Sequence, residues 1–367
     1  MSRIRAIHQI VPGFQFGDAI THYTLRLQNL FRSWGYASGI FAEGIHPKVL
    51  SLCSPLSQFL TVDSEQTLVI LHYSIHSEAS RVFLEAKARK ILLYHNITPP
   101  EFFAGYSELH QRMTQMGRER LGSFLGVTEQ TWADSPYNCR ELLACGYRDP
   151  RVVPLLVDFR DLDLAFANPN LLRRYRDDKV NLLFVGRLAP NKGHLDLLHT
   201  LAAYNKLICD TARLFIVGPY NGLESYFDEL RQEALDLEIE GSVIFTGAVT
   251  FSDLKAYYRV SDVFVCLSEH EGFCVPLLEA MHFDVPIVAY AAGAVPETLG
   301  EAGVLLHSKD PARVTEVVAR LVEDREWCSG VIRGQRERLK FFAREQVIEQ
   351  IGSLLSPILG GKEPLIA

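Results

Sequence analysis

The chain has 367 residues, of which 48% are hydrophobic and 22% charged, a balance typical of folded globular proteins. This length allows two domains of ordinary size. The net charge of −7 gathers in the second half, because residues 1–165 hold 16 basic and 16 acidic side chains, which leaves 21 (37 − 16) and 28 (44 − 16) for the remainder. An acidic second half argues against nucleic acid as a partner.

The cysteine pattern and the N-terminal sequence indicate a cytoplasmic protein. The seven cysteines are irregularly spaced, with no CxxC pair and no Cys/His set at zinc spacing, so we expect reduced thiols and no metal. Met1 to Gln9 lack an apolar signal region, and no stretch reaches the roughly 18 apolar residues of a membrane span. Any membrane contact is therefore expected to be peripheral, on the inner face.

Short apolar runs alternate with helical patterns along the whole chain, which predicts parallel sheets covered by helices. The first run is followed by a loop at 12–17 and a helical pattern from Ile20 to Trp34, for which Asp18 is the expected cap. The strands are expected at 4–11, 67–73, 90–94, 180–185, 212–217, 243–245 and 262–267.

A charged segment without strand character, residues 158–179, predicts the boundary between two doubly wound domains. We place the first domain at residues 1–165 and the second at 166–343. A final amphipathic helix is expected at 345–359, within a C-terminal segment of residues 344–367.

The loop that follows the predicted strand 180–185 carries two cations. Arg187 offers a planar fork and Lys192 a compact charge, a combination that suits a diphosphate. A triphosphate P-loop would need Gly at Asn191 and Ser or Thr at Gly193, so that motif is rejected. The alternative interpretation is a solvated basic loop.

The run from Ser268 to Met281 places two carboxylates, Glu271 and Glu279, around a Gly-Phe-Cys turn. A buried strand is expected before this run, and a helix at 275–283 is expected to begin inside it, so residues 272–274 form a strand-to-helix turn. Backbone amides and the helix dipole make such a turn favourable for anions. The alternative interpretation is an acidic surface loop beside a helix.

Together these two stretches resemble the retaining glycosyltransferases of family 4, which carry a Gly-Arg-Leu…Lys-Gly loop and a Glu-x7-Glu element. The resemblance spans residues 179–307 and is looser in the first half. It implies the GT-B fold, in which two Rossmann-like α/β domains face a central cleft. It also implies that the C-terminal helix packs back on the first domain.

The resemblance assigns roles residue by residue. Glu279 is expected at the ribose and Glu271 at the transferred sugar, while Arg187 and Lys192 clamp the diphosphate and act in catalysis with Glu271. In the first domain, Gly17 should let a loop approach the phosphate, and His95 should face the donor sugar as a catalytic residue. His8 and His72 are taken as packing residues. Further contacts to the nucleotide sugar are expected from Gly272, Phe273, Cys274 and Val249.

The implied reaction is transfer of a sugar, with retention, from a nucleotide-diphosphate sugar to a saccharide or lipid-linked saccharide. The run Tyr94 to Phe103 resembles bacterial relatives that add mannose or deoxy-mannose units to surface polysaccharides, and this resemblance implies GDP-mannose or a GDP-deoxy-mannose as donor. No metal or other cofactor is expected, and Asp161-Leu-Asp163 is taken as linker and not as a metal site. The alternatives are a nucleotide-sugar epimerase on the same fold and a catalytically silent binding subunit.

Overall fold

The computed structural model describes residues 3–360 and divides them into two compact units. Unit 1 comprises residues 3–101, 109–157 and 342–360, and unit 2 comprises residues 102–108 and 158–341. Among the described residues, no helix is both long and apolar enough to cross a bilayer.

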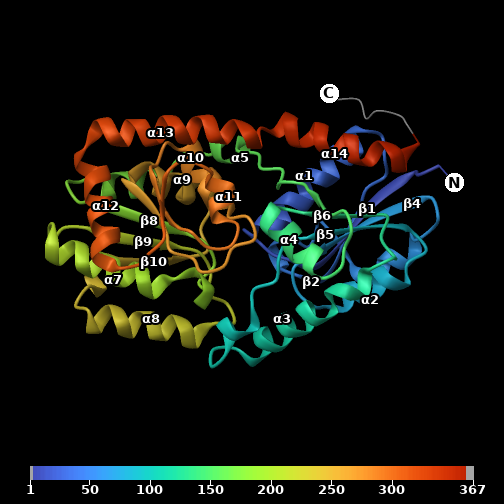
Figure 1. Ribbon diagram of the computed structural model, residues 1–367, viewed down its shortest axis with the longest axis horizontal. Coiled ribbons are helices and arrows are strands. Elements are labelled where there is room, and N and C mark those ends of the chain that lie inside the picture. Colours follow the sequence, from blue (N-terminus) through green and yellow to red (C-terminus); the bar gives the residue numbers. More distant parts are fainter. Residues whose placement is uncertain (1–2, 361–367) are drawn as a thin grey trace. The chain divides into compact units, whose positions relative to one another are not determined.

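Unit 1 is built on a parallel sheet of seven strands with the order β3-β2-β1-β4-β5-β6-β7 (Figure 1). Strand order reverses beside β1, whose Ile7 pairs with Leu68 of β4. The elements are β1 (Ala6–Phe14), α1 (Ala19–Ser33), β2 (Ile40–Ile45), β3 (Ser54–Pro55), β4 (Thr67–Tyr73), α2 (Glu78–Glu85), β5 (Arg89–Tyr94), α3 (Glu108–Arg120), β6 (Gln130–Ala133), α4 (Pro136–Ala144), β7 (Arg151–Val152) and α14 (Arg344–Leu359).

Unit 2 contains a parallel sheet of six strands with the order β10-β9-β8-β11-β12-β13. Its elements are α5 (Arg160–Leu164), α6 (Pro169–Tyr175), β8 (Asn181–Val185), α7 (His194–Leu207), β9 (Arg213–Val217), α8 (Glu224–Asp236), β10 (Val243–Gly247), α9 (Phe251–Val260), β11 (Val263–Cys266), α10 (Val275–His282), β12 (Ile287–Tyr290), α11 (Val295–Leu299), β13 (Val304–Leu306), α12 (Pro311–Glu323) and α13 (Arg325–Leu339). The prediction of two doubly wound, Rossmann-like parallel sheets is confirmed.

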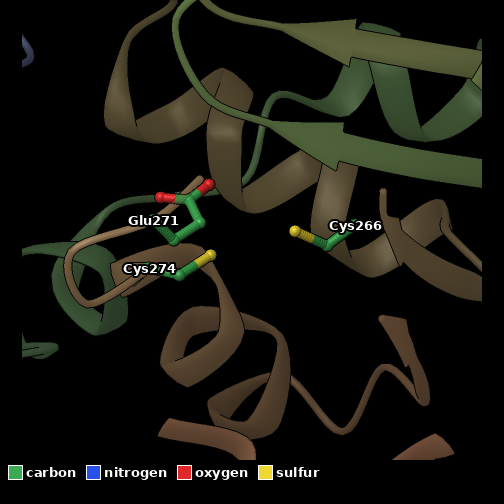
Figure 2. Close-up of side chains that lie close together, drawn as sticks. All are labelled: Cys266, Glu271 and Cys274. Atoms are coloured by element: carbon green, nitrogen blue, oxygen red, sulfur yellow. The ribbon is translucent and has the colours of Figure 1, made fainter. Parts of the chain in front are cut away.

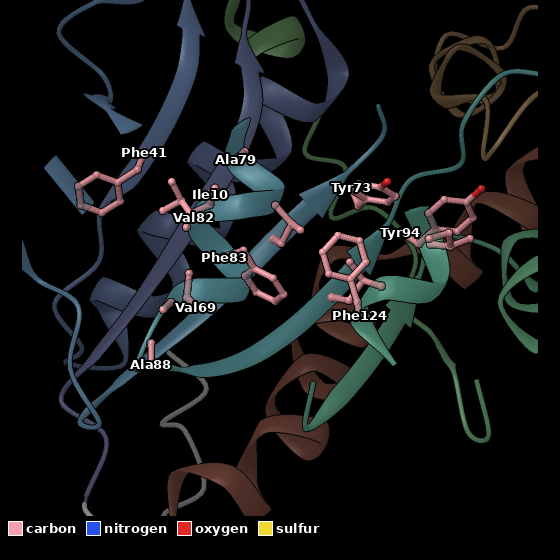
Figure 3. Packing of buried hydrophobic residues seen from close by; sticks show 14 of the residues in the cluster. Ile10, Phe41, Val69, Tyr73, Ala79, Val82, Phe83, Ala88, Tyr94 and Phe124 are labelled. Carbon is pink, nitrogen blue, oxygen red and sulfur yellow. The ribbon is translucent and has the colours of Figure 1, made fainter. Parts of the chain in front are cut away.

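The core of unit 1 explains why its central strands are apolar without alternation. All seven residues of β4 are buried, because a parallel sheet is covered on both faces. The Tyr73 ring meets Phe124 edge to face at 4.9 Å, and its hydroxyl donates to the Gly117 carbonyl at 2.7 Å (Figure 3). The buried Tyr73 hydroxyl therefore has a hydrogen-bond acceptor within the aromatic core.

The unit boundaries fall at residues 157 and 341, whereas the sequence placed them at 165 and 343. Residues 158–165 belong to unit 2 because α5 is fastened there: His282 lies 2.8 Å from Asp163, and Lys255 donates to the Asp163 carbonyl at 2.7 Å. Helix α14 belongs to unit 1 and is bonded to two of its strands. Gln130 of β6 donates to the Leu354 carbonyl at 2.7 Å, and Arg89 of β5 donates to the Ile358 carbonyl at 2.8 Å. The remainder of the predicted C-terminal segment, residues 361–367, lies outside the described part.

Gly218 gives a test of how tightly the loops of unit 2 approach one another. A Cβ at this position would lie 1.9 Å from the Gly186 carbonyl oxygen, so we expect Gly218→Ala to lower the free energy of unfolding by on the order of 3 kcal/mol. The matched control is Gly241→Ala, where nothing lies within 4 Å of the added carbon, and the expected change is within about 0.5 kcal/mol. Urea unfolding measures both, and equal stability of the two variants would contradict the described approach.

Candidate functional site

Two loops of unit 2 leave neighbouring strands where the order of the sheet reverses. Strand β8 lies between β9 and β11, and ligands of open parallel sheets bind beyond the carboxyl ends of strands at such a point. Residues 186–193 follow β8 and are called the Lys192 loop; residues 267–274 follow β11 and are called the Glu271 loop. Both predicted motifs therefore lie at the topological switch point of unit 2.

The structure brings two predicted site residues together as an ion pair. Lys192 Nζ donates to Glu271 Oε2 at 2.8 Å, and the side chains are only 21% and 9% exposed. Burial by itself would lower the pKa of Lys192, but the Glu271 carboxylate and neighbouring groups outweigh it, so that this pKa is raised. Lys192 therefore keeps its positive charge beside the Glu271 carboxylate, and it retains further N–H donors for a ligand.

Hydrogen bonds of Asn191 hold the two loops together around this pair. The Asn191 side-chain amide Nδ2 donates to the His270 carbonyl at 3.0 Å, and the Glu269 N–H donates to the Asn191 carbonyl at 2.8 Å. Gly193 has a φ of 68°, and a Cβ there would lie 2.2 Å from the Leu267 carbonyl oxygen. Glycine at 193 therefore permits the approach that places Lys192 beside Glu271.

A third loop, after β12, supports the Glu271 loop from its other side. The Ala294 N–H donates to the Glu271 carbonyl at 2.9 Å, and Thr298 Oγ1 donates to the Phe273 carbonyl at 2.5 Å. Residues 272–274 then lead into α10, with Cys274 as its N-cap in the left-handed conformation. The predicted strand-to-helix turn is present, and the positive end of α10 favours an anion there.

Arg187 and Val249 lie at the same edge of the sheet, after β8 and β10 respectively. Arg187 is exposed, and its Nη2 donates to the Asn221 carbonyl at 2.9 Å. A hydrogen bond from a guanidinium to a neutral carbonyl is weaker than one to a phosphate oxygen. A diphosphate could therefore replace the Asn221 carbonyl as the acceptor of Arg187.

Glu279 has a partner that the sequence did not reveal. The buried Tyr258 on α9 donates its hydroxyl to Glu279 Oε2 at 2.8 Å. Burial, and then the Glu279 carboxylate, raises the pKa of Tyr258, so the phenol keeps its proton and remains a donor. One oxygen of Glu279 is thereby fixed, which positions the carboxylate for a hydroxyl-bearing ligand.

The fold also gathers two thiols beside Glu271. Cys266 ends β11 and Cys274 precedes α10, and one ligand atom from each, with a Glu271 oxygen, lies within 4.8 Å of the others (Figure 2). All three residues are buried. Nothing in the sequence indicated Cys266 beyond its place in an apolar strand, and Cys274 was expected only as a contact of the nucleotide sugar.

Gly17 and His95 lie in unit 1. Gly17 has a φ of 78° in the loop between β1 and α1, directly before Asp18, whose carboxylate caps α1 by accepting from the Thr21 N–H at 3.0 Å. The predicted cap is confirmed. The role of Gly17 at a phosphate stays a prediction.

His95 belongs to a buried chain of four polar side chains. Its Nδ1 lies 2.7 Å from Asp134 Oδ2 and its Nε2 lies 2.8 Å from His72 Nδ1, while His72 Nε2 lies 3.0 Å from Gln9 Oε1. Interpreting His72 as a packing residue was therefore incomplete. Both ring nitrogens of His95 face protein side chains, so a direct contact between this imidazole and a sugar would require one of these bonds to break.

The proton positions along these four hydrogen-bonded side chains follow from the Thr24 backbone carbonyl. Gln9 Nε2 donates to the Thr24 carbonyl at 3.0 Å, which turns Gln9 Oε1 toward His72 and requires a proton on His72 Nε2. Burial, and then His95, lowers the pKa of His72, so its Nδ1 is an acceptor and His95 Nε2 is the donor. Burial raises the pKa of Asp134, despite the opposing effect of His95.

The Asp161-Leu-Asp163 sequence lies in α5, where Asp163 pairs with His282. Over residues 3–360, the group of side chains close enough to hold a metal is Cys266, Glu271 and Cys274, and it includes neither aspartate.

Residues 173–345 match the family model described as glycosyl transferases group 1. The matched segment contains both loops and Glu279. The match covers nearly half of the chain and confirms the resemblance seen in the sequence.

Several curated proteins are similar to part of the chain. A GDP-mannose-dependent alpha-(1-6)-phosphatidylinositol monomannoside mannosyltransferase of Mycobacterium tuberculosis is 32% identical over 170 residues, which cover 44% of this chain and 43% of that protein. A D-inositol 3-phosphate glycosyltransferase of Geodermatophilus obscurus is 30% identical over 251 residues, 65% of this chain and 54% of that protein. The chain spans about half the length of these relatives.

Solved structures match nearly the whole chain at low identity. Sucrose-phosphate synthase from Thermosynechococcus elongatus has a TM-score of 0.77 at 17% identity and covers 98% of this chain and 100% of its own. Anabaena HepE in complex with UDP-glucose has a TM-score of 0.75 at 17% identity, with 96% and 99% covered. At this identity the likeness establishes the fold.

The Lys192–Glu271 pair can be tested without any ligand. We expect a double-mutant cycle of Lys192→Met and Glu271→Gln to give a coupling free energy of about 1–3 kcal/mol, because each change alone leaves a half-buried charge without its partner. The matched control cycle uses Lys340 and Glu337, an ion pair with side chains 68% and 70% exposed, where no measurable coupling is expected. Urea unfolding measures both cycles. Indistinguishable couplings would mean that Lys192 and Glu271 do not interact as described.

Proposed function

We propose that this protein transfers a hexosyl residue from a nucleotide-diphosphate sugar to a hydroxyl group of a saccharide or lipid-linked saccharide acceptor. The family whose model matches residues 173–345 supports the reaction class. The observation that carries the proposal is the Lys192–Glu271 pair at the topological switch point of unit 2, where a cation and a carboxylate lie together beside a helix N-terminus.

The diphosphate is assigned to Lys192, Arg187 and the turn at 272–274. Lys192 uses one N–H on Glu271 and can direct the others to a phosphate oxygen, while Arg187 exchanges the Asn221 carbonyl for a charged acceptor. The amides that lead into α10 add neutral donors. These groups bind the diphosphate and stabilise the negative charge that develops as it leaves.

The two carboxylates are assigned to the two sugars of the donor. Glu279, held by Tyr258, accepts from the ribose hydroxyls. Glu271 accepts from a hydroxyl of the transferred sugar, and it already lies beside the cation that binds the phosphate. The protein would therefore bind the donor on both sides of the bond that breaks, the one between the anomeric carbon and the phosphate oxygen. Val249, after β10, is proposed to contact the nucleotide.

In the proposed reaction the acceptor oxygen attacks the anomeric carbon on the face from which the phosphate departs. The bond between that carbon and the phosphate oxygen breaks, and the leaving phosphate takes the proton of the acceptor hydroxyl. The configuration is retained, and the products are a glycoside and a nucleoside diphosphate. The protein supplies no nucleophile in this scheme, so the cations Arg187 and Lys192 carry the larger share of catalysis.

The proposed donor is GDP-mannose or a GDP-deoxy-mannose. The names of two relatives support a mannosyl donor: the M. tuberculosis protein, and an O-antigen chain mannosyltransferase B of Escherichia coli that is 31% identical over 147 residues, 40% of this chain and 37% of that protein. Both names also describe glycolipid or polysaccharide products, which supports a saccharide or lipid-linked acceptor. A role for His95 in holding the sugar remains part of the proposal.

Removing the two cations should abolish donor binding. We expect Arg187→Ala with Lys192→Ala to weaken the binding of GDP by about 100-fold or more, since two charge-assisted contacts of about 1.5–3 kcal/mol each are lost. Isothermal titration calorimetry with GDP and with UDP measures this and shows which base is preferred.

The matched control is Lys206→Ala with Arg231→Ala, which removes two exposed cations from α7 and α8 and should leave the affinity unchanged. Unchanged GDP and UDP affinity in the Arg187/Lys192 variant would remove the diphosphate from these loops. Conversion of the nucleotide sugar without any acceptor would identify an epimerase instead.

A further inference from the structure

The buried thiols of Cys266 and Cys274 and the Glu271 carboxylate form a compact set of ligand atoms from separate elements. Cys266 ends β11, Cys274 caps α10, and Glu271 lies in the loop between them (Figure 2). The atoms lie within 4.8 Å of one another, and all seven cysteines of the chain are free thiols. The spacing of the two cysteines in the sequence matches no zinc motif, so the fold of the Glu271 loop alone creates this set.

The backbone at Cys274 is unusual for a residue with a side chain. It has a φ of 70° and a ψ of 68°, in the left-handed region that glycine occupies without strain. A cysteine held there directs a thiol toward the partner thiol and Glu271 at the cost of a strained backbone. Strain of this kind is concentrated at functional positions.

We propose that Cys266, Cys274 and Glu271 bind a soft divalent cation, Zn²⁺ or Cd²⁺, in competition with the nucleotide-sugar donor. Two thiolates and one carboxylate are ligands that zinc prefers, and a water can complete a tetrahedron. With zinc–sulfur bonds of about 2.3 Å, two sulfurs of a tetrahedral site lie about 3.8 Å apart, so small rotations of the two side chains suffice.

The charge balance of the pocket is compatible with this cation despite the nearby Lys192. Without metal, the Lys192 ammonium offsets the Glu271 carboxylate. With metal, three positive charges, two from the ion and one from Lys192, meet three negative charges from two thiolates and Glu271. The buried site with bound metal is therefore neutral, which avoids the penalty of an unpaired charge.

The competition rests on the proposed function. A metal on Glu271 and Cys274 would occupy the carboxylate assigned to the sugar and the turn assigned to the diphosphate. By linkage, the donor and the metal would weaken each other's binding by the same factor. The ion acts here as an inhibitor, and the transfer reaction does not use it.

Cadmium titration of the reduced, full-length protein tests the site directly, through the ultraviolet absorption that thiolate–cadmium bonds produce. We expect one Cd²⁺ per chain, and displacement by Zn²⁺. Cys266→Ser and Cys274→Ser should each weaken binding at least 10-fold, and Glu271→Gln should weaken it less. Cys209→Ser, outside this site, is the matched control and should bind as the wild type does. Thermal unfolding verifies that each variant is folded.

The proposal is overturned if the wild type gives no thiolate–cadmium band, or if Cys266→Ser binds cadmium as tightly as Cys209→Ser. Should Cys274→Ser fail to fold, the intensity of the wild-type band per bound Cd²⁺ keeps the test decisive, since the intensity of a single thiolate–cadmium bond would exclude a two-thiolate site. Calorimetry of GDP with and without Zn²⁺ separates the two proposals. Cadmium binding that leaves GDP affinity unchanged overturns the competition, whereas GDP binding without a cadmium band overturns only the metal site.

Discussion

The ion pair between Lys192 and Glu271 is the interaction on which the organisation of unit 2 as a binding site depends. It joins the loops that follow β8 and β11, the two strands between which the order of the sheet reverses. A lysine left alone in this half-buried place would be driven toward its neutral form, and a lone carboxylate would be costly. Together they keep both charges in place before any ligand arrives.

The backbone around the pair is fixed by approaches that only small residues allow. Gly193 meets the Leu267 carbonyl, and a Cβ at Gly293 would lie 2.5 Å from the Glu271 carbonyl oxygen. Asn191 adds two hydrogen bonds to the opposite loop. Side-chain positions held in this way lose little entropy on binding a ligand, which is the physical meaning of preorganisation.

The sequence predicted those parts of the fold that rest on local patterns. Apolar runs located β4 at Thr67–Tyr73 and β5 at Arg89–Tyr94 within a residue, because buried parallel strands are apolar on both faces. It missed β2, β3, β6, β7, β12 and β13, and all of these except the six-residue β2 have four residues or fewer. The last of these, Val304–Leu306, is only half-buried, so its three residues carry too little pattern to recognise.

Contacts between elements could not be predicted from the sequence, for a different reason. The bonds from Tyr258 to Glu279 and from His72 to His95 join residues 21 and 23 positions apart, and nothing in either position marks the partner. Cys266 looks like any other apolar strand residue until the Glu271 loop folds back beside it. Motifs identified the loops, and only the three-dimensional arrangement shows which side chains each loop presents to the others.

The most direct test of the central claim is a crystal structure of the protein with an unreactive analogue of GDP-mannose. The account predicts the diphosphate within hydrogen-bond distance of Lys192 Nζ and of the amides at 272–274, with Glu279 on the ribose and Glu271 on the mannosyl group. A diphosphate bound away from both the Lys192 loop and the Glu271 loop would contradict it.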